Sequence, residues 1–358
     1  MRNLVIRAAF ASASTHFRIV LMKLFACPAC ASRLYFENSR CLACSSSVAY
    51  APERAGFVLV GAESRNCLNA DECACNWVGD QRFGGYCRAC ALNRTIPDLS
   101  VPENRDRWAR VERAKRRVVF ALLEFGLPVW PKQRPADEEG LAFDFLADPK
   151  GAGPGGERIL TGHDNGLITL NVAEADSPER ERMRIAMGEN YRTLLGHFRH
   201  ELGHYYWDRL VRDHPERLEA FRALFGDERE DYAQALQRHY ENAAPPDWEQ
   251  RHISAYAASH AWEDWAETWA HYLHIADTLE MAEEFRIPLH TLDVAAASAV
   301  RETDPHSDID GVVSRWLALT EIVNGINRCM GLRDLYPFVI SPKVAEKLDY
   351  VRRLLQGA

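Results

Sequence analysis

The stretch LLGHFRHELGHYYW, residues 194–207, decides the fold of the larger part of the chain. Its apolar residues Leu195, Phe198, Leu202 and Tyr205 recur at intervals of three and four. This spacing places the four side chains on one side of a helix. The stretch therefore predicts a helix that packs an apolar stripe against a protein core.

The same stretch contains an HExxH sequence, His200-Glu201-Leu202-Gly203-His204. Residues four apart lie one helical turn above each other on the same face, so two imidazoles at this spacing can converge on one Zn²⁺ at about 2.0–2.1 Å. Glu201 is turned by about 100° around the axis, which places its carboxylate beside the metal without binding it. We expect His200 and His204 to bind zinc. Glu201 would be the general base that takes a proton from water and delivers it to a leaving amine.

Two neighbours of these residues carry further expectations. Gly203 has no side chain, which would leave room for a substrate beside the metal. His197 stands one turn before His200 on roughly the same face of the helix. It would either replace one of the named ligands or orient the site from behind them.

A third zinc ligand should come from a separate element, because two histidines leave a tetrahedral site incomplete. The stretch SAYAASHAWEDWAETWAHYLH, residues 254–274, offers Glu263, Glu267 and His271 on successive turns of one helix, with Asp264 rotated away from them. A third histidine six residues after the motif is absent, since position 210 is leucine. The spacing alone leaves the choice among these carboxylates and His271 open.

Nine of the ten cysteines lie between Cys27 and Cys90, and the tenth, Cys329, is expected to be a small buried apolar residue. Tight CxxC pairs indicate metal ligands and a reducing compartment, so we expect a cytoplasmic protein. Two CxxC turns with ten residues between them predict one structural Zn²⁺ site, made by Cys27, Cys30, Cys41 and Cys44. Cys87 and Cys90 should form half of a second structural zinc site, with two partners among Cys67, Cys73 and Cys75.

The chain divides into four regions. Residues 1–22 are expected to be an extension that is either disordered or precedes the real start at Met22. Residues 23–50 form a zinc ribbon, residues 51–100 a second cysteine-rich zinc module with a linker, and residues 101–358 the domain of the HExxH helix. The linker is expected over RTIPDLSVPEN, 94–104, followed by a helix over 105–125 whose basic residues at 105–117 face solvent. Short strands are expected over 141–176, with GLITLN (166–171) as the best of them, and helices over 179–212, 261–285 and 310–328.

Composition limits the class of protein. Hydrophobic residues make up 47% and charged residues 26%, as in ordinary globular proteins, and no apolar run reaches the roughly 18 residues of a membrane helix. The formal net charge is −8, and the acidic excess lies after residue 100. A large acidic body argues against non-specific nucleic-acid binding there.

The longer motifs resemble a known family. CPAC and CLAC, CNW and CRACALNRTIPDLS, TGHDNGLITLNVAEAD, and the pair HFRHELGHYYWD and AWEDWAETWAHYLH are similar to zinc-binding metallopeptidases with an N-terminal zinc ribbon, a family named from its sequence motif. The catalytic half also resembles the gluzincin group. The resemblance implies that Cys67 and Cys75 complete the second cysteine site and that Glu263 is the third catalytic ligand. It further implies that Tyr256 faces the reaction intermediate and that GLITLN is the edge strand along which a peptide lies.

Together these observations predict an α+β chain with zinc-ribbon modules followed by a mostly helical, gluzincin-like domain with a small sheet. The expected activity is zinc-dependent hydrolysis of peptide bonds, as an endopeptidase acting on a peptide or protein substrate, with one catalytic and two structural Zn²⁺ and no membrane contact. The zinc ribbons would be available for contacts with protein or nucleic acid. The alternative is a non-catalytic zinc-ribbon adaptor in which the HExxH zinc is structural; four protein ligands would favour that alternative, and three would favour the enzyme.

Overall fold

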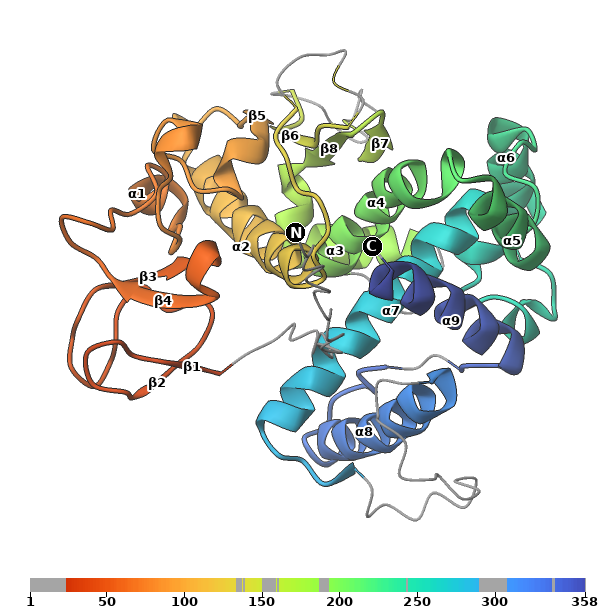
Figure 1. Ribbon diagram of the computed structural model, residues 1–358. Helices are drawn as coiled ribbons and strands as arrows, with labels where there is room; N and C mark the ends of the chain where they lie inside the picture. The colour runs from red at the N-terminus through yellow and green to blue at the C-terminus, as the bar shows by residue number, and fades with distance from the viewer. Residues whose placement is uncertain are drawn as a thin grey trace, which may run out of the picture.

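A computed structural model describes most of the chain. The described residues are 24–132, 137, 139–149, 159, 161–186, 193–242, 244–289, 308–336 and 339–357, without the side chains of 183–186. The expected extension at residues 1–22 lies outside them. The fold is α+β, as the sequence predicts: a cysteine-rich part lies at one side of the molecule and a helical part with a small sheet at the other (Figure 1).

The first cysteine-rich part consists of two small antiparallel sheets. They pair β1 (Phe25–Ala26) with β2 (Arg33–Leu34), and β3 (Val48–Ala51) with β4 (Gly56–Leu59). Phe25 and Tyr50 point inward and contact Phe120, with ring centroids 6.3 and 5.4 Å apart. Phe120 belongs to α2 (Pro102–Glu124). The ribbon therefore packs its aromatic core directly on a helix of the other part of the chain.

The second cysteine-rich part contains α1 (Ala70–Cys73) and ends in β5 (Asn93–Thr95). The segment 94–104 is therefore not a linker throughout, because its first two residues belong to β5, which pairs in parallel with β6 (Ala142–Leu146). The hydrogen bonds of this pair connect the cysteine-rich part to the sheet of the helical part.

The expectation of a solvated basic face on α2 is confirmed only in part, because Arg105, Arg110 and Arg113 are exposed but two other basic residues are not. Lys115 and Arg116 are buried, with 0% and 3% of their surfaces exposed, although both belong to the basic run 105–117. Glu112, one turn earlier, pairs with both in the interior: its carboxylate is 2.7 Å from Lys115 Nζ and 3.8 Å from Arg116 Nη1. These residues are buried because α2 packs against both the cysteine-rich part, through α1, and the helical part of the molecule, through α4.

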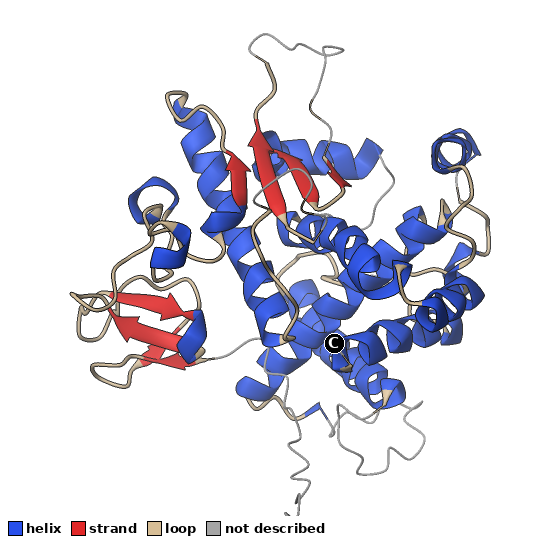
Figure 2. Ribbon diagram, turned by 45° about the horizontal axis from the view of Figure 1, so that its top comes forward, coloured by secondary structure: helices blue, strands red, loops and turns tan. Residues whose placement is uncertain are grey.

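The larger sheet has the strand order β5-β6-β8-β7, in which β8 (Leu167–Asn171) is parallel to β6 and β7 (Gly162–Asp164) is antiparallel to β8. Figure 2 shows its strands side by side, next to α2. GLITLN is a strand, as predicted, but it is not the edge strand. The tight turn at Asn165 and Gly166, both at positive φ, folds β7 back onto β8, so β7 forms the edge of the sheet.

Helices form most of the remainder. Their bounds are α3 (Ser177–Ala186), α4 (Leu194–Trp207), α5 (Pro215–Phe225), α6 (Tyr232–Asn242), α7 (Ala261–Glu284), α8 (Ile309–Cys329) and α9 (Pro342–Gln356). A further π-helical turn, Asp208–Arg212, extends α4. The helices expected over 261–285 and 310–328 agree with α7 and α8. Among the described residues, no helix combines the length and apolar character that crossing a membrane requires.

The contact between α4 and α7 is the most extensive between any two described elements. A Cβ atom on Gly203 would lie 3.0 Å from Ala266 Cα and 3.2 Å from Trp269 Cδ1, both on α7. Gly203 therefore allows the two helices to approach closely, and the expectation that it leaves room for a substrate is wrong. The carbonyl of Gly203 also accepts a hydrogen bond from Trp265 Nε1, at 2.7 Å.

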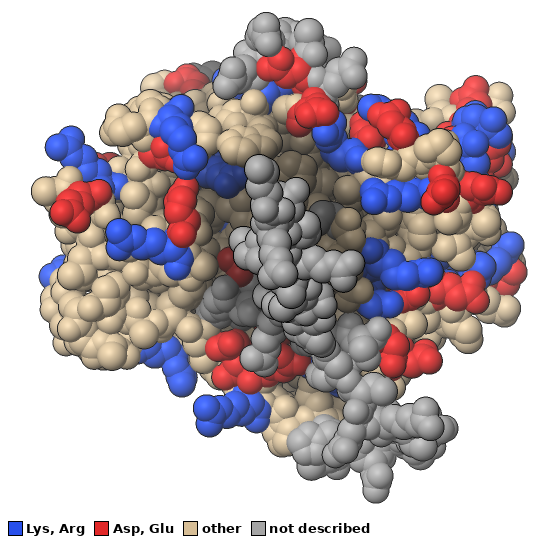
Figure 3. Space-filling model, viewed as in Figure 1, with Lys and Arg blue, Asp and Glu red and all other residues tan. Residues whose placement is uncertain are grey.

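Two surface features complete the fold. Cys329 is exposed at the last residue of α8, so the expectation that it is buried is wrong. On the face seen in Figure 3, acidic and basic side chains are interspersed over the helical part of the molecule. Ion pairs in the helical part of the molecule include Arg222 with Glu228 and Arg229 with Asp227.

Candidate functional site

The two histidines of the HExxH sequence point to one place. Thr193 caps the start of α4 by accepting a hydrogen bond from the backbone N–H of Gly196, so the helix is regular through the motif. His200 Nε2 and His204 Nε2 lie 3.2 Å apart. His204 is 4% exposed, and its ring packs on that of Trp262, with centroids 4.1 Å apart.

Glu263 approaches the same place from α7. The preceding His260 caps this helix by accepting from the backbone N–H of Trp262, which fixes Glu263 in the first turn. Glu263 Oε2 is 3.0 Å from His200 Nε2, and Oε1 is 3.6 Å from His204 Nε2. The pKa of Glu263 is well below its usual range: burial alone would raise it, but the contacts with the imidazoles of His204 and His200 outweigh burial and lower it.

These three side chains fit a zinc ion. In a tetrahedral site with about 2.0–2.1 Å to each ligand, neighbouring ligand atoms are roughly 3.3 Å apart, close to the distances of 3.0, 3.2 and 3.6 Å between these nitrogens and oxygens. The buried Glu263 Oε2 also has no hydrogen-bond partner, although a nitrogen lies 3.0 Å away. An unpaired buried carboxylate oxygen is costly, whereas an oxygen bound to a metal is not.

Glu267 contacts the outer side of the same site. Its Oε1 is 2.7 Å from His200 Nδ1, and its Oε2 accepts a hydrogen bond from the Ser254 hydroxyl, also at 2.7 Å. Burial would raise the pKa of Glu267, but the hydrogen bond from His200 lowers it to about 2. Glu267 therefore holds His200 by the nitrogen that faces away from Glu263.

Glu201 lies beside this cluster and is 6% exposed. Its Oε1 is 3.2 Å from His197 Nε2, and His197 Nδ1 is 2.7 Å from Glu174 Oε2. Burial would raise the pKa of Glu201, yet the hydrogen bond from His197 and the nearby imidazoles lower it. Of the two roles left open for His197, the geometry favours a contact with Glu201, because both ring nitrogens face carboxylates.

Two tyrosines border the cluster. Tyr256 lies in a short 3-10 turn before α7, with its ring centroid 6.0 Å from that of His200. Tyr232, on α6, donates a hydrogen bond to Glu263 Oε1 at 2.6 Å. Tyr232 was not predicted from the sequence, because it is 31 residues from Glu263 and no local pattern connects the two residues.

His163, on the edge strand β7, is a second residue that the sequence analysis missed. Its ring lies 6.4 Å from that of His204 and 6.3 Å from that of Trp262. Its Nε2 accepts a hydrogen bond from the backbone N–H of Gly166, so the neutral ring carries its proton on Nδ1. Burial and the neighbouring His204 lower its pKa to about 4. The sequence HDNG, residues 163–166, is typical of a turn between two strands, but it does not indicate that His163 lies near the zinc ligands.

The other candidates on α7 do not join the cluster. His271 Nδ1 hydrogen-bonds to the hydroxyl of Tyr336, at 2.7 Å. Asp264 pairs with Lys347 of α9 and lies 3.0 Å from His252. Both residues connect α7 to its neighbours instead.

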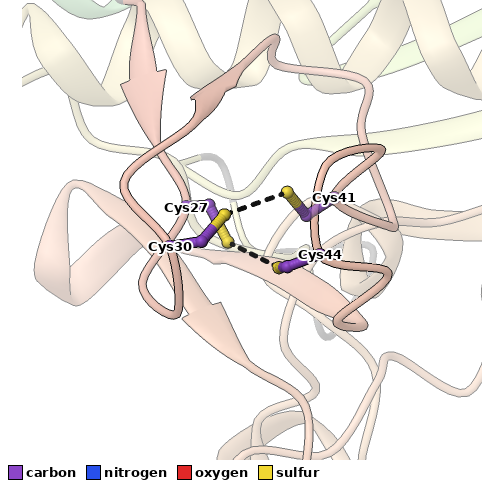
Figure 4. Close-up of side chains that lie close together, drawn as sticks. All are labelled: Cys27, Cys30, Cys41 and Cys44. Carbon is purple, nitrogen blue, oxygen red and sulfur yellow. Dashed lines mark hydrogen bonds between the residues drawn. The ribbon is translucent and has the colours of Figure 1, made fainter.

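The first set of cysteines is brought together by its two CxxC turns (Figure 4). Sγ of Cys27 is 3.7 Å from that of Cys44, and Sγ of Cys30 is 3.6 Å from that of Cys41. Four thiolates around Zn²⁺ at about 2.3 Å would be roughly 3.8 Å apart. All four are free cysteines, and the set fits a zinc ion.

The second set is completely buried and consists of Cys67, Cys75, Cys87 and Cys90. Cys75 Sγ lies 3.6 Å from Cys87 Sγ and 3.7 Å from Cys90 Sγ. Cys73 is outside this set and donates to the carbonyl of Asn69. Buried Arg116 is 3.7 Å from the Cys73 sulfur, which brings a positive charge to the side of a thiolate cluster.

Comparison with known proteins finds a zinc-ribbon domain followed by a zinc-binding domain. The model of a family described as "Putative zinc-binding metallo-peptidase" matches residues 104–354, and that of a zinc-ribbon domain matches residues 24–101. An uncharacterized protein of Mycobacterium tuberculosis is 41% identical over 337 residues, which cover 93% of this chain and 95% of that protein. An uncharacterized protein of Mycobacterium bovis matches with the same identity and coverage. No solved structure matches the chain.

Proposed function

Because this chain belongs to the family of zinc-binding metallo-peptidases whose model it matches, we propose that it hydrolyses peptide bonds with Glu201 as the general base. The observation that carries the proposal is the convergence of His200, His204 and Glu263 within 4.8 Å of one another, from two helices, beside a buried carboxylate. A Zn²⁺ held by these three residues would polarise the scissile carbonyl and activate a water molecule.

Three further residues have separate roles in proton transfer, stabilisation of the intermediate and orientation of a zinc ligand. Glu201 takes the proton of the attacking water and transfers it to the leaving amine. The contacts with neighbouring imidazoles lower its pKa despite its burial, so the side chain is a carboxylate, the form that can accept a proton. Tyr256 donates its hydroxyl hydrogen to the oxygen that becomes negative in the tetrahedral intermediate. Glu267 holds His200 in its orientation through the Nδ1 contact.

A cluster of three protein ligands favours a catalytic zinc site over a structural one. Catalytic zinc sites keep one coordination position for water or substrate, whereas structural sites use four protein ligands. Within the described part of the chain, the group contains two histidines and one glutamate, with no fourth His, Cys, Asp or Glu. The two cysteine sets, with four thiols each, have the composition of structural sites.

The sheet supports a peptide as the substrate. β7 is the edge strand, and its His163 lies beside His204 and Trp262. An extended peptide that pairs with β7 would pass along the cluster, and strand pairing suits an internal segment of a chain. We therefore assign endopeptidase activity, with β7 instead of β8 as the strand that pairs with the substrate.

The experiment that tests this function compares the protein termini generated in a proteome by the wild-type chain and by Glu201→Gln. The substitution preserves size and leaves His200, His204 and Glu263 in place, so zinc content should not change. We expect new termini only with the wild-type chain. Identical sets of termini for the two proteins, at equal zinc content, would contradict the proposal.

A further inference from the structure

The carboxylate of Glu201 is held by a neighbour that is not part of the metal cluster. His197 precedes it by one turn on α4, and its Nε2 is 3.2 Å from Glu201 Oε1. The side chains of His197 and Glu201 are only 13% and 7% exposed, so water competes little for this contact. A donor fixed on Oε1 leaves Oε2 as the oxygen that is available to a water molecule.

His197 is itself fixed from the opposite side. Its Nδ1 is 2.7 Å from Oε2 of Glu174, whose side chain is 4% exposed. Glu174 lies in the 3-10 turn Val172–Ala175, directly after β8. Its Oε1 accepts a hydrogen bond from Thr161, and its backbone carbonyl accepts one from Arg180 at 2.7 Å. The imidazole is therefore held between two buried carboxylates, one from the sheet side and one from its own helix.

The same geometry separates His197 from the zinc ligands. His200 and His204 direct their Nε2 atoms at each other and at Glu263, whereas the Nε2 of His197 faces Glu201. His197 is not part of the group that could hold the ion. Its contacts concern the base and not the metal.

We propose that His197 is a positioning residue for Glu201 and that Glu174 fixes the orientation of His197. This inference rests on the proposed function, because positioning of a base matters only if Glu201 is one. The free carboxylate of a glutamate has several rotamers, and general acid–base transfer requires the base within about 2.6–3.2 Å of the proton it takes. Successive contacts link Glu201 to His197, His197 to Glu174, and Glu174 to Thr161. They select one rotamer of the Glu201 side chain and connect this side chain to the residue before the edge strand β7.

Two variants of His197 separate positioning from packing. His197→Phe keeps a ring of similar size and removes both ring nitrogens. His197→Gln keeps an amide N–H that can reach Glu201 in place of Nε2–H. We expect His197→Phe to retain zinc in the His/His/Glu site and to leave KM nearly unchanged while kcat falls roughly 10–100-fold, less than the loss on removing a general base. His197→Gln should have most of the wild-type kcat. The kcat of Glu174→Gln should lie between those of His197→Phe and His197→Gln.

A second readout does not depend on activity. Crystal structures of the zinc-loaded wild-type protein and of zinc-loaded His197→Phe would show the Glu201 side chain directly. We expect a single rotamer in the wild-type protein and a different or divided one in the variant. A wild-type protein without peptidase activity would contradict the proposed function. An unchanged Glu201 in His197→Phe, or a loss of zinc in place of a loss of kcat, would overturn the positioning role instead.

Discussion

The two glutamates on neighbouring turns of α7 differ in the nitrogen of His200 that each one faces. Glu263 is 3.0 Å from Nε2, the nitrogen directed at His204, and Glu267 is 2.7 Å from Nδ1. One imidazole can bind a metal with one nitrogen and donate a hydrogen bond with the other, and that bond fixes its orientation. The two carboxylates are therefore expected to have different effects on zinc affinity.

A matched pair of substitutions tests this difference. Glu263→Ala should empty the His/His/Glu site while both cysteine sites stay filled, because it removes a direct ligand. Glu267→Ala should lower the zinc affinity of the site by only about 10–100-fold, as the loss of an orienting group does. Zinc titration of the two variants measures both effects. Equal affinities, or a greater loss in Glu267→Ala, would reverse the assignment.

Tyr232 and Tyr256 form a second pair with separable roles. Tyr256→Phe should lower kcat by roughly 10²–10³-fold with little effect on zinc affinity, because it removes one donor to the intermediate. Tyr232→Phe removes the hydrogen bond to Glu263 Oε1, so it should mainly weaken zinc binding, by about 10–100-fold. Steady-state kinetics and zinc titration of each variant distinguish these outcomes. If Tyr232→Phe retains full zinc affinity but has a lower kcat, the role assigned to Tyr232 is wrong, and Tyr232 acts on the reaction instead of on zinc binding.

At the scale of elements, the close packing of α4 on α7 places His200, His204 and Glu263 within reach of one another. Gly203 sits at this contact, and a Cβ there would be 3.0 Å from the backbone of Ala266. Overpacking typically costs about 1–3 kcal/mol. The higher helix propensity of alanine returns only about 1 kcal/mol. The net effect of Gly203→Ala should be destabilising.

Gly325 provides the control for this prediction. It also lies inside a helix, α8, but a Cβ there would meet nothing within 4 Å. Gly325→Ala should therefore raise the midpoint of thermal unfolding of the zinc-loaded protein, and Gly203→Ala should lower it. Gly203→Ala should also reduce zinc affinity, because separating the helices moves Glu263 away from the histidines. A rise in the midpoint for both variants would show that α4 and α7 are not in tight contact at this position.

At the scale of the whole molecule, the chain contains two sets of four cysteines and one His/His/Glu cluster with the composition of zinc sites. We expect about three Zn²⁺ per chain, two in the cysteine sets and one in the His/His/Glu cluster. Elemental analysis of protein purified without chelators measures this number, and one zinc or fewer would refute it. Small modules of this size bury little apolar surface, so metal binding should contribute directly to their folding.

Removal of the cysteine-bound zinc should affect α2 as well as the ribbons. Cys90 Sγ is 3.8 Å from Glu112, and Arg116 is 3.7 Å from Cys73, so the second cysteine set packs on this helix. Hydrogen exchange after chelation should increase in residues 24–101 and on the side of α2 that faces them. The same measurement on Glu263→Ala, which keeps the cysteine sites, should show no such increase. Equal exchange in both samples would contradict this coupling.

Features that depend on neighbours within a few residues could be predicted from the sequence. The helix of HExxH, the pairing of cysteines within CxxC turns and the strand at 167–171 all follow from local spacing. Each of these patterns brings its side chains together within one turn or one pleat, so a chain that adopts the local structure also assembles that part of the cluster.

Edge strands, burial and long-range hydrogen bonds could not be predicted from the sequence, because they depend on contacts between distant segments. Whether β8 is an edge strand depends on β7, which the turn at Gly166 folds beside it. The burial of Lys115 and the close approach at Gly203 depend on which elements cover α2 and α4, and Tyr232 reaches Glu263 only because α6 packs near α7. Composition and periodicity describe one face of one element, whereas burial and hydrogen-bond partners belong to two elements at once, and the free energy of their packing fixes which pairs form.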